Sequence, residues 1–94
     1  MARQGQSARM YFVRGRVHGV GFRDYTQRVA SALGITGYVR NLDDGRVEVY
    51  AAGSQQQLSD LAAALRKGPR FSDVRGVEEM EAAVQQYSDF QIEV

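Results

Sequence analysis

The sequence predicts an α+β domain in which an antiparallel sheet is covered on one face by two helices. Segments with the apolar spacing of a strand and segments with that of a helix follow one another, and glycines separate them. Hydrophobic residues make up 44% of the 94 residues, which supports one compact core rather than a disordered chain. The sequence has no internal repeat or linker, so we expect a single domain over residues 9–94.

A first strand and a first helix are predicted on either side of a glycine-rich stretch. Residues 9–14 are apolar at nearly every position, which is typical of a strand inside a sheet. Residues 1–8 are polar and small, and we expect them to form a flexible tail. From residue 22 to residue 33, apolar side chains recur at helical spacing, and Gly34 then favours a left-handed end to the helix.

A β-hairpin follows this helix. Residues 35–42 favour extended structure, and Asp43-Asp44-Gly45 is a strong turn signal. Apolar and polar residues alternate over residues 46–51, which predicts a strand with one face toward the core. Gly53 ends this strand.

A second helix is predicted to begin at a capping box. Ser54 takes the N-cap position and Gln57 stands three residues later, so each side chain can satisfy a backbone N–H of the other. An apolar stripe follows at helical spacing. Lys67 suits the negative end of the helix dipole, and Gly68-Pro69 ends the helix.

The last quarter of the chain allows two interpretations. Its apolar residues are spaced more like a helix than a strand, although two strands with a bulge also fit; these residues are Val74, Val77, Met80 and Val84. The preceding order of strand, helix, strand, strand and helix is five-sixths of a ferredoxin-like βαββαβ pattern. We therefore predict a strand at 73–82 and a short strand at 90–94, in a sheet of four to five strands.

Charge and composition exclude several classes of function. With a net charge of +1, a pI near 8.1 and interspersed charges, the chain lacks the basic surface of a nucleic-acid or membrane-surface binder. The absence of cysteine excludes disulfides and thiolate metal sites, and a single histidine argues against a transition-metal site. Since no apolar run resembles a membrane span or a secretion signal, we expect a soluble, cytoplasmic protein.

The glycine-rich stretch between the first strand and the first helix is a candidate anion site. Gly15, Gly19 and Gly21 let the backbone turn tightly and let its N–H groups converge, and the following helix start adds free N–H groups. Arg23 falls in the first helical turn, where its guanidinium can reach back and hold two oxygens of a phosphate. The alternative is a tight connection whose glycines serve only geometry.

Neighbouring residues restrict the chemistry of this stretch. A nucleotide-binding P-loop would need glycine at Val20 and a following Lys-Ser/Thr pair, and a dinucleotide fingerprint would need glycine at Asp24. A thiol phosphatase would need cysteine at Val17. The stretch can therefore hold a phosphate but carries no nucleophile, so any hydrolysis must use water directly.

Asn41 is predicted to face the same pocket as Arg23. In a split βαβ unit the first and second strands are parallel and the third lies between them, so both strands end at one edge of the sheet. Two strand spacings, roughly 9–10 Å, then separate the glycine stretch from Asn41. A side-chain amide there can accept a hydrogen bond from water and donate one to an oxyanion. The alternative is that Asn41 bonds its own backbone before the turn.

Three stretches of the sequence resemble the acylphosphatase family. They are Gly15-Arg16-Val17-His18-Gly19-Val20-Gly21-Phe22-Arg23, residues 33–41 and residues 44–48. The likeness continues through Gly53, Gly68-Pro69 and Phe90-Gln91-Ile92, and it covers residues 9–94. This chain departs from the family pattern at His18, where glutamine is common, and at Tyr38, where tryptophan is common.

The resemblance implies a ferredoxin-like enzyme that hydrolyses the carboxyl–phosphate anhydride of small-molecule acyl phosphates to carboxylate and inorganic phosphate. It implies that Arg23 and the loop bind the phosphate and that Asn41 orients the attacking water. The expected loop residues are Gly15, Arg16, Val17, His18, Gly19, Val20, Gly21 and Phe22. We expect no metal, cofactor or covalent intermediate, phosphate or sulfate in the loop, no nucleic-acid or membrane partner, and a monomer.

Three alternatives compete with parts of this interpretation. RNA-recognition modules share the fold, but they need aromatic residues on the first and third strands, and residues 46–50 carry one aromatic and no matching motif. A non-catalytic anion-binding or protein-interaction domain of the same fold is the second alternative. His18 is also a candidate general base, because histidine titrates near neutral pH in general, although a solvent-facing position in the loop is the simpler expectation.

Overall fold

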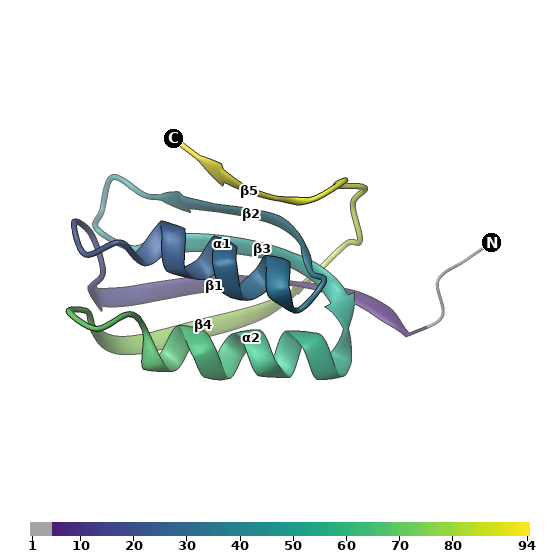
Figure 1. The fold of residues 1–94 in the computed structure, drawn as a ribbon, viewed down its shortest axis with the longest axis horizontal. Coiled ribbons are helices and arrows are strands. Elements are labelled where there is room, and N and C mark those ends of the chain that lie inside the picture. The colour runs from purple at the N-terminus through teal and green to yellow at the C-terminus, as the bar shows by residue number, and fades with distance from the viewer. Residues whose placement is uncertain (1–4) are drawn as a thin grey trace.

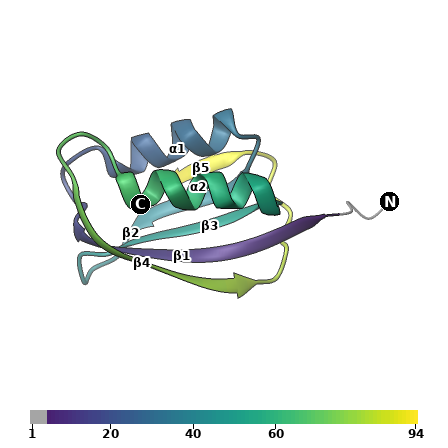
Figure 2. The ribbon, with the colours of Figure 1, turned by 90° about the horizontal axis from the view of Figure 1, so that it is seen from below.

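The computed structural model describes residues 5–94, which form one five-stranded sheet with two helices packed on one of its faces (Figures 1 and 2). In chain order the elements are β1 (Gln6–Arg16), α1 (Phe22–Ala32), β2 (Thr36–Asn41), β3 (Val47–Ser54), α2 (Gln55–Lys67), β4 (Asp73–Ala82) and β5 (Phe90–Glu93). This order confirms the predicted ferredoxin-like βαββαβ pattern.

The strand order across the sheet is β4-β1-β3-β2-β5. β3 lies at the centre and is antiparallel to both β1 and β2, so β1 and β2 run in the same direction, as the split βαβ interpretation requires. The sheet is mixed rather than wholly antiparallel, because β5 pairs with β2 in parallel. Aromatic contacts support this pairing, since the ring of Tyr87, in the connection that leads to β5, lies tilted against the rings of Tyr38 and Tyr50.

The predicted element boundaries hold to within a few residues except at the start of β1. That strand begins at Gln6 instead of residue 9, and its register pairs Gln6 with Ser54 of β3, so residues 6–8 belong to the sheet and not to a tail. The first four residues of the predicted tail lie outside the described residues. The capping box is present as predicted, with the Ser54 side chain accepting from the Gln57 backbone N–H and the Gln57 side chain accepting from that of Ser54.

A β-bulge explains why the sequence of β4 resembles a helix. The register passes from Arg14–Gly76 to Gly15–Val74, so Arg75 has no partner on β1. The extra residue turns Val74 and Val77, which are three positions apart, toward the same core. The helix-like spacing of these valines is therefore produced by an irregular edge strand.

Buried side chains between the sheet and the helices form the core. The residues with the largest fully buried side chains are Tyr11, Phe22, Ile35, Leu58, Leu61, Leu65, Val13, Val17, Val39, Val47, Val49 and Thr26. Strand β3 is buried from Val47 through Gly53 and carries the neighbouring strands on both sides. Within residues 5–94, no helix has the length and apolar character needed to cross a membrane.

Gly15 is expected to be indispensable to the fold. Its φ is +125°, and a Cβ there would meet the backbone of Asp73 and Arg75 at the bulge. We expect Gly15→Ala to lower the free energy of unfolding by about 3 kcal/mol, the combined scale of backbone strain and overpacking. Urea unfolding followed by circular dichroism measures this change.

Gly45→Ala is the matched control for Gly15→Ala. Gly45 also has a positive φ, +95°, but nothing lies within 4 Å of an added Cβ. We expect this variant to lose only about 1 kcal/mol, from strain alone. Equal losses in the two variants would contradict the proposed close approach at Gly15.

Candidate functional site

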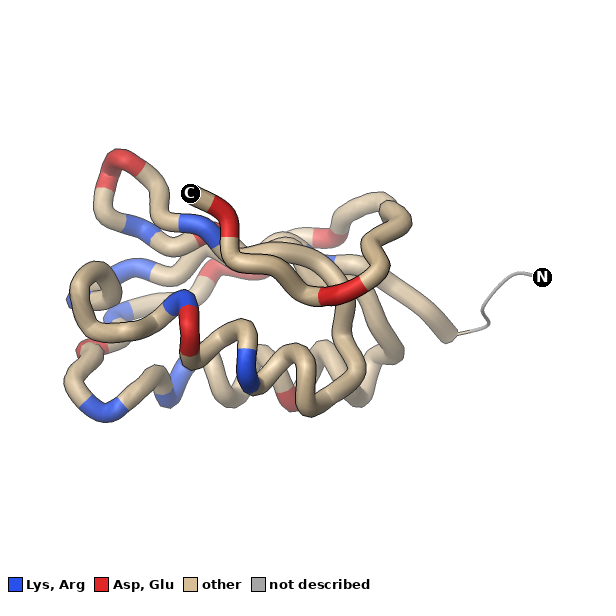
Figure 3. The backbone as a smooth tube through the Cα atoms, turned by 45° about the horizontal axis from the view of Figure 1, so that its top comes forward, with Lys and Arg blue, Asp and Glu red and all other residues tan. Residues whose placement is uncertain are grey.

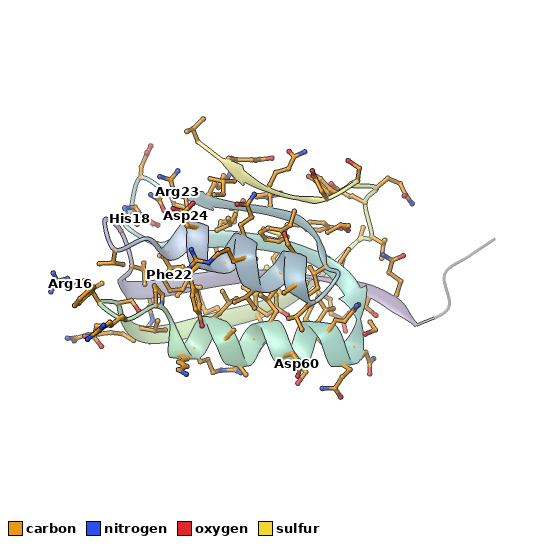
Figure 4. All side chains as sticks on the ribbon, viewed as in Figure 1. Arg16, His18, Phe22, Arg23, Asp24 and Asp60 are labelled. Atoms are coloured by element: carbon orange, nitrogen blue, oxygen red, sulfur yellow. The ribbon has the colours of Figure 1, made fainter. Side chains whose placement is uncertain are left out.

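A cavity of about 360 Å³ opens at the edge of the sheet where β1 and β2 end. The segment after β1, the first turn of α1, the end of β2 and the β5 edge all contribute to it. The lining residues are Val17, Gly19, Gly21, Phe22, Arg23, Asp24, Asn41, Ile92 and Val94. Three segments that are distant in sequence therefore meet at one site, namely residues 17–24, the end of β2 and the β5 edge, and Figure 4 labels Phe22, Arg23 and Asp24 at the start of α1.

The loop side of the cavity is built from backbone in unusual conformations. Gly19 and Gly21 have φ values of +71° and +77°, which favour glycine. Gly21 is the N-cap of α1, and no side chain caps the helix there. The first N–H groups of a helix have no intrahelical partner, so those of the first turn are available to a ligand and carry the positive end of the helix dipole.

Arg23 reaches from the first turn of α1 toward β5. The side chain is half-buried, and Nη1 donates to the backbone oxygen of Glu93 at 3.4 Å. Within the described part of the chain, no carboxylate lies within ion-pair distance of its guanidinium. The guanidinium therefore keeps most of its donors for an anion.

Positive charge also gathers around this end of the domain. Figure 3 shows that Lys and Arg positions concentrate at the end where the loop lies, opposite the N-terminal trace, while Asp and Glu are more evenly spread. A local excess of positive charge raises the concentration of anions near a site and their rate of association. The near-neutral net charge of the whole chain hides this local asymmetry.

Asn41 closes the opposite side of the cavity as the last residue of β2. Its side-chain oxygen Oδ1 is buried and has no hydrogen-bond partner among the described residues. The alternative in which this oxygen bonds the neighbouring backbone before the turn is therefore not what the structure contains. A buried acceptor of this kind needs a donor, and Asn41 is a lining residue of the cavity.

Strand β2 is held in place on the face of the sheet that lies opposite the helices. The Tyr38 hydroxyl and Arg40 Nε both donate to Oε2 of the buried Glu48, at 2.7 and 2.9 Å. Burial of the tyrosine, followed by this hydrogen bond, raises the pKa of Tyr38 well above its ordinary value. The network fixes the strand immediately before Asn41.

The hairpin turn after Asn41 has its own support. The backbone N–H of Arg46 donates to Asp44 Oδ1 at 3.0 Å, and Arg46 Nε donates to Oδ2 at 2.9 Å. The backbone hydrogen bond is the main reason that the pKa of Asp44 lies below its ordinary value.

The predicted loop residues divide into two groups. Val17, Gly19, Gly21 and Phe22 line the cavity, whereas Gly15, Arg16, His18 and Val20 do not. Gly15 and Arg16 belong to β1, and Val20 packs against the core. His18 is exposed, and its Nε2 lies 3.0 Å from the backbone oxygen of Arg46, outside the cavity lining.

Sequence reasoning missed three lining residues, which are Asp24, Ile92 and Val94. Asp24 follows Arg23 directly in the first turn of α1, so its place in the site could have been predicted from the sequence. Ile92 enters only because β5 pairs with β2 in parallel, a contact between distant segments that no local pattern indicates.

The lining offers charge and backbone donors but few reactive side chains. It contains no serine, threonine, cysteine or histidine, and Asp24 is its single carboxylate side chain. Nowhere in residues 5–94 do three or more His, Cys, Asp or Glu residues gather as metal ligands. The arrangement can bind a tetrahedral oxyanion through Arg23 and the helix start, with an amide oxygen on the opposite side.

Fold and cavity together define a small ferredoxin-like α+β domain whose cavity combines Arg23, an uncapped helix start and Asn41. A family model described as Acylphosphatase matches residues 9–92. An acylphosphatase of Solibacter usitatus is 64% identical over 85 residues, which cover 90% of this chain and 88% of that protein. For an acylphosphatase of Archaeoglobus fulgidus the identity is 48% over 81 residues, covering 86% of this chain and 91% of that protein.

Solved structures agree with these sequence comparisons. An acylphosphatase from Coxiella burnetii superimposes with a TM-score of 0.92 at 34% identity, covering 96% of this chain and 95% of that one. The chain belongs to the acylphosphatase family.

Arg23 is expected to dominate the affinity of the cavity for an oxyanion. Because charge-assisted, bidentate contacts are the strong ones, we expect Arg23→Ala to weaken binding of inorganic phosphate by about tenfold or more. Titration calorimetry at low salt measures the dissociation constant. Arg28→Ala is the matched control, since Arg28 is an exposed arginine of the same helix that does not line the cavity. Equal weakening in both variants would show that general positive charge, and not Arg23, holds the anion.

Proposed function

We propose that this chain is an acylphosphatase that hydrolyses acyl phosphates by direct attack of water on phosphorus. The phosphoryl group binds to Arg23 and to the N–H groups around Gly21, and Asn41 orients the water. One observation carries these assignments: Arg23 and Asn41, which come from separate elements, line the same cavity, and Oδ1 of Asn41 has no partner among the described residues.

Each step of the reaction can be assigned to groups in the cavity. The water oxygen forms a bond to phosphorus while the bond from phosphorus to the acyl oxygen breaks, and the electron pair leaves with the carboxylate. The water proton passes to the phosphate product or to solvent. Because a carboxylate is a good leaving group, no general acid is required, and the reaction can proceed through positioning and charge stabilisation alone.

The position of Asn41 suits the orientation of water. Its Oδ1 can accept a hydrogen bond from the attacking water, and its amide nitrogen can donate to an oxygen that gains charge in the transition state. Val17 and Ile92 add apolar surface to the cavity lining, which suits the acyl part of such a substrate. The family relationship favours this enzymatic function over the non-catalytic alternative.

Hydrolysis of benzoyl phosphate in excess EDTA tests the proposal directly. We expect wild-type turnover that the chelator does not change, and a loss of at least about 10²-fold in Asn41→Ala and in Arg23→Ala, the scale for removing one oriented donor from a reacting oxyanion. Ultraviolet absorbance follows the reaction, and circular dichroism checks folding. Arg28→Ala, as control, should retain wild-type rates. Full activity in Asn41→Ala would contradict its assigned role, and an inactive, folded wild type would favour the non-catalytic alternative.

Asp24 is expected to select against acyl groups that carry a second negative charge. It is the single carboxylate side chain in the lining and is exposed, so its repulsion acts through water and is modest. We expect Asp24→Asn to raise kcat/KM about threefold for succinyl phosphate and less for benzoyl phosphate. Asp60→Asn, on α2 and far from the cavity in Figure 4, should change neither. An equal rise for both substrates would contradict selection by charge, and added salt should remove the difference.

A further inference from the structure

We infer that His18 is a positioning residue, which ties the phosphate-binding loop to the turn after Asn41 and so sets the distance between phosphate and attacking water. This inference rests on the proposed function, because the distance between phosphate and water matters only if water attacks the phosphorus. The tie is the hydrogen bond between His18 Nε2 and the backbone oxygen of Arg46, and its presence can be tested without measuring turnover. His18 does not touch the reacting atoms, because it lies outside the cavity lining.

The first observation is a backbone oxygen that accepts two hydrogen bonds. The carbonyl oxygen of Arg46 lies 3.0 Å from His18 Nε2 and 2.8 Å from the backbone nitrogen of Leu42. Leu42 directly follows Asn41, and its own carbonyl oxygen accepts from the N–H of Gly45 at 3.1 Å. The carbonyl that closes the hairpin next to Asn41 is therefore the one that holds His18.

On the loop side, His18 stands between two residues that line the cavity. Val17 is buried in the core, whereas Gly19 is exposed and would have no atom within 4 Å of an added Cβ. Over residues 17–21, the His18 contact is the one side-chain hydrogen bond that the described structure contains. Without it, the stretch from His18 to Gly21 would depend for its position on its two ends and on the packing of Val20 against the core.

The turn that receives His18 is itself fixed to β1. The Arg46 guanidinium pairs with Asp44 at 2.9 Å and lies over the Phe12 ring, 5.0 Å from its centroid. Phe12 belongs to the strand that leads into the loop. Strand β1, the glycine loop and the hairpin turn at Arg46 are thus connected by a ring of contacts, and the hydrogen bond of His18 completes that ring.

The chemistry of the contact sets the requirements on the side chain. A carbonyl oxygen only accepts, so Nε2 of His18 carries the proton and donates it. Nε2 is then unable to act as a general base while the tie is intact. Any replacement must present an N–H donor at similar reach, which glutamine can do, whereas asparagine is one methylene shorter and alanine has no donor.

Loss of the tie should affect turnover more than phosphate binding. Phosphate is held by Arg23 and the helix start, which lie on the loop side of the cavity, and Asn41 lies on the other side. Loosening the loop changes the position of phosphate relative to Asn41 but leaves the phosphate ligands together. The signature is therefore a lower kcat with a nearly unchanged inhibition constant for phosphate.

The test compares four proteins with benzoyl phosphate as substrate and inorganic phosphate as inhibitor: wild type, His18→Ala, His18→Asn and His18→Gln. We expect kcat to fall about tenfold in the alanine and asparagine variants, the scale of one hydrogen bond, and to stay within about threefold of wild type in the glutamine variant. The inhibition constant for inorganic phosphate should change less than about twofold in every variant, well below the effect of losing one hydrogen bond. Circular dichroism and thermal unfolding separate these effects from misfolding.

A double-mutant cycle tests whether His18 acts through Asn41. If it does, His18→Ala should have little further effect in an Asn41→Ala background, because the distance to that amide no longer matters. If the losses in kcat of the two single substitutions multiply in the double variant, the positioning role is wrong. It is also wrong if kcat is unchanged in His18→Ala, or if kcat in His18→Gln falls as far as in His18→Ala. An inactive wild type would overturn the proposed function and this role together.

Nuclear magnetic resonance tests the tie independently of catalysis. The ring ¹⁵N spectrum should show the proton of neutral His18 on Nε2, and the amide of Leu42 should exchange faster in His18→Ala than in wild type. A proton on Nδ1, or unchanged exchange at Leu42, would overturn the tie even in a fully active enzyme.

Discussion

The site depends on the burial of strand β3 between β1 and β2, two strands that run parallel to each other and antiparallel to β3. Every residue from Val47 through Gly53 is buried, so β3 must pair on both edges, and β1 and β2 supply those pairs. Because both neighbours are antiparallel to β3, they end at the same edge of the sheet. The glycine loop and Asn41 then face one cavity although β3 separates β1 from β2 in the sheet.

The groups that make the cavity useful are costly for the fold. The uncapped start of α1 leaves N–H groups without intrahelical partners, and Oδ1 of Asn41 is a buried acceptor with no partner among the described residues. The buried Oδ1 lowers stability, since burial removes it from water without replacing the hydrogen bond. The core between sheet and helices offsets this cost. A tetrahedral oxyanion with an attached or neighbouring water is a ligand that satisfies donor and acceptor at once.

Local sequence signals predicted those features that local interactions produce. The Ser54–Gln57 capping box, the turn at Asp43-Asp44-Gly45 and the glycine-to-helix transition before Arg23 each involve residues within a few positions, and the structure contains all three. The meeting of Arg23 and Asn41 was also predictable, because it follows from topology. The bulge at Arg75, the place of Ile92 in the lining and the hydrogen bond from His18 to Arg46 were not, since each depends on a register or contact between distant segments.

These contacts between distant segments determine how precisely the side chains of the site are positioned. Arg23 and Glu93 are in contact although 70 positions separate them, and His18 and Arg46 although 28 do. A reaction that relies on positioning and charge loses rate when such contacts loosen, because no reactive side chain compensates for poor alignment. The residues proposed to bind phosphate can therefore be read from a short motif, whereas the precision of their placement is a property of the whole sheet.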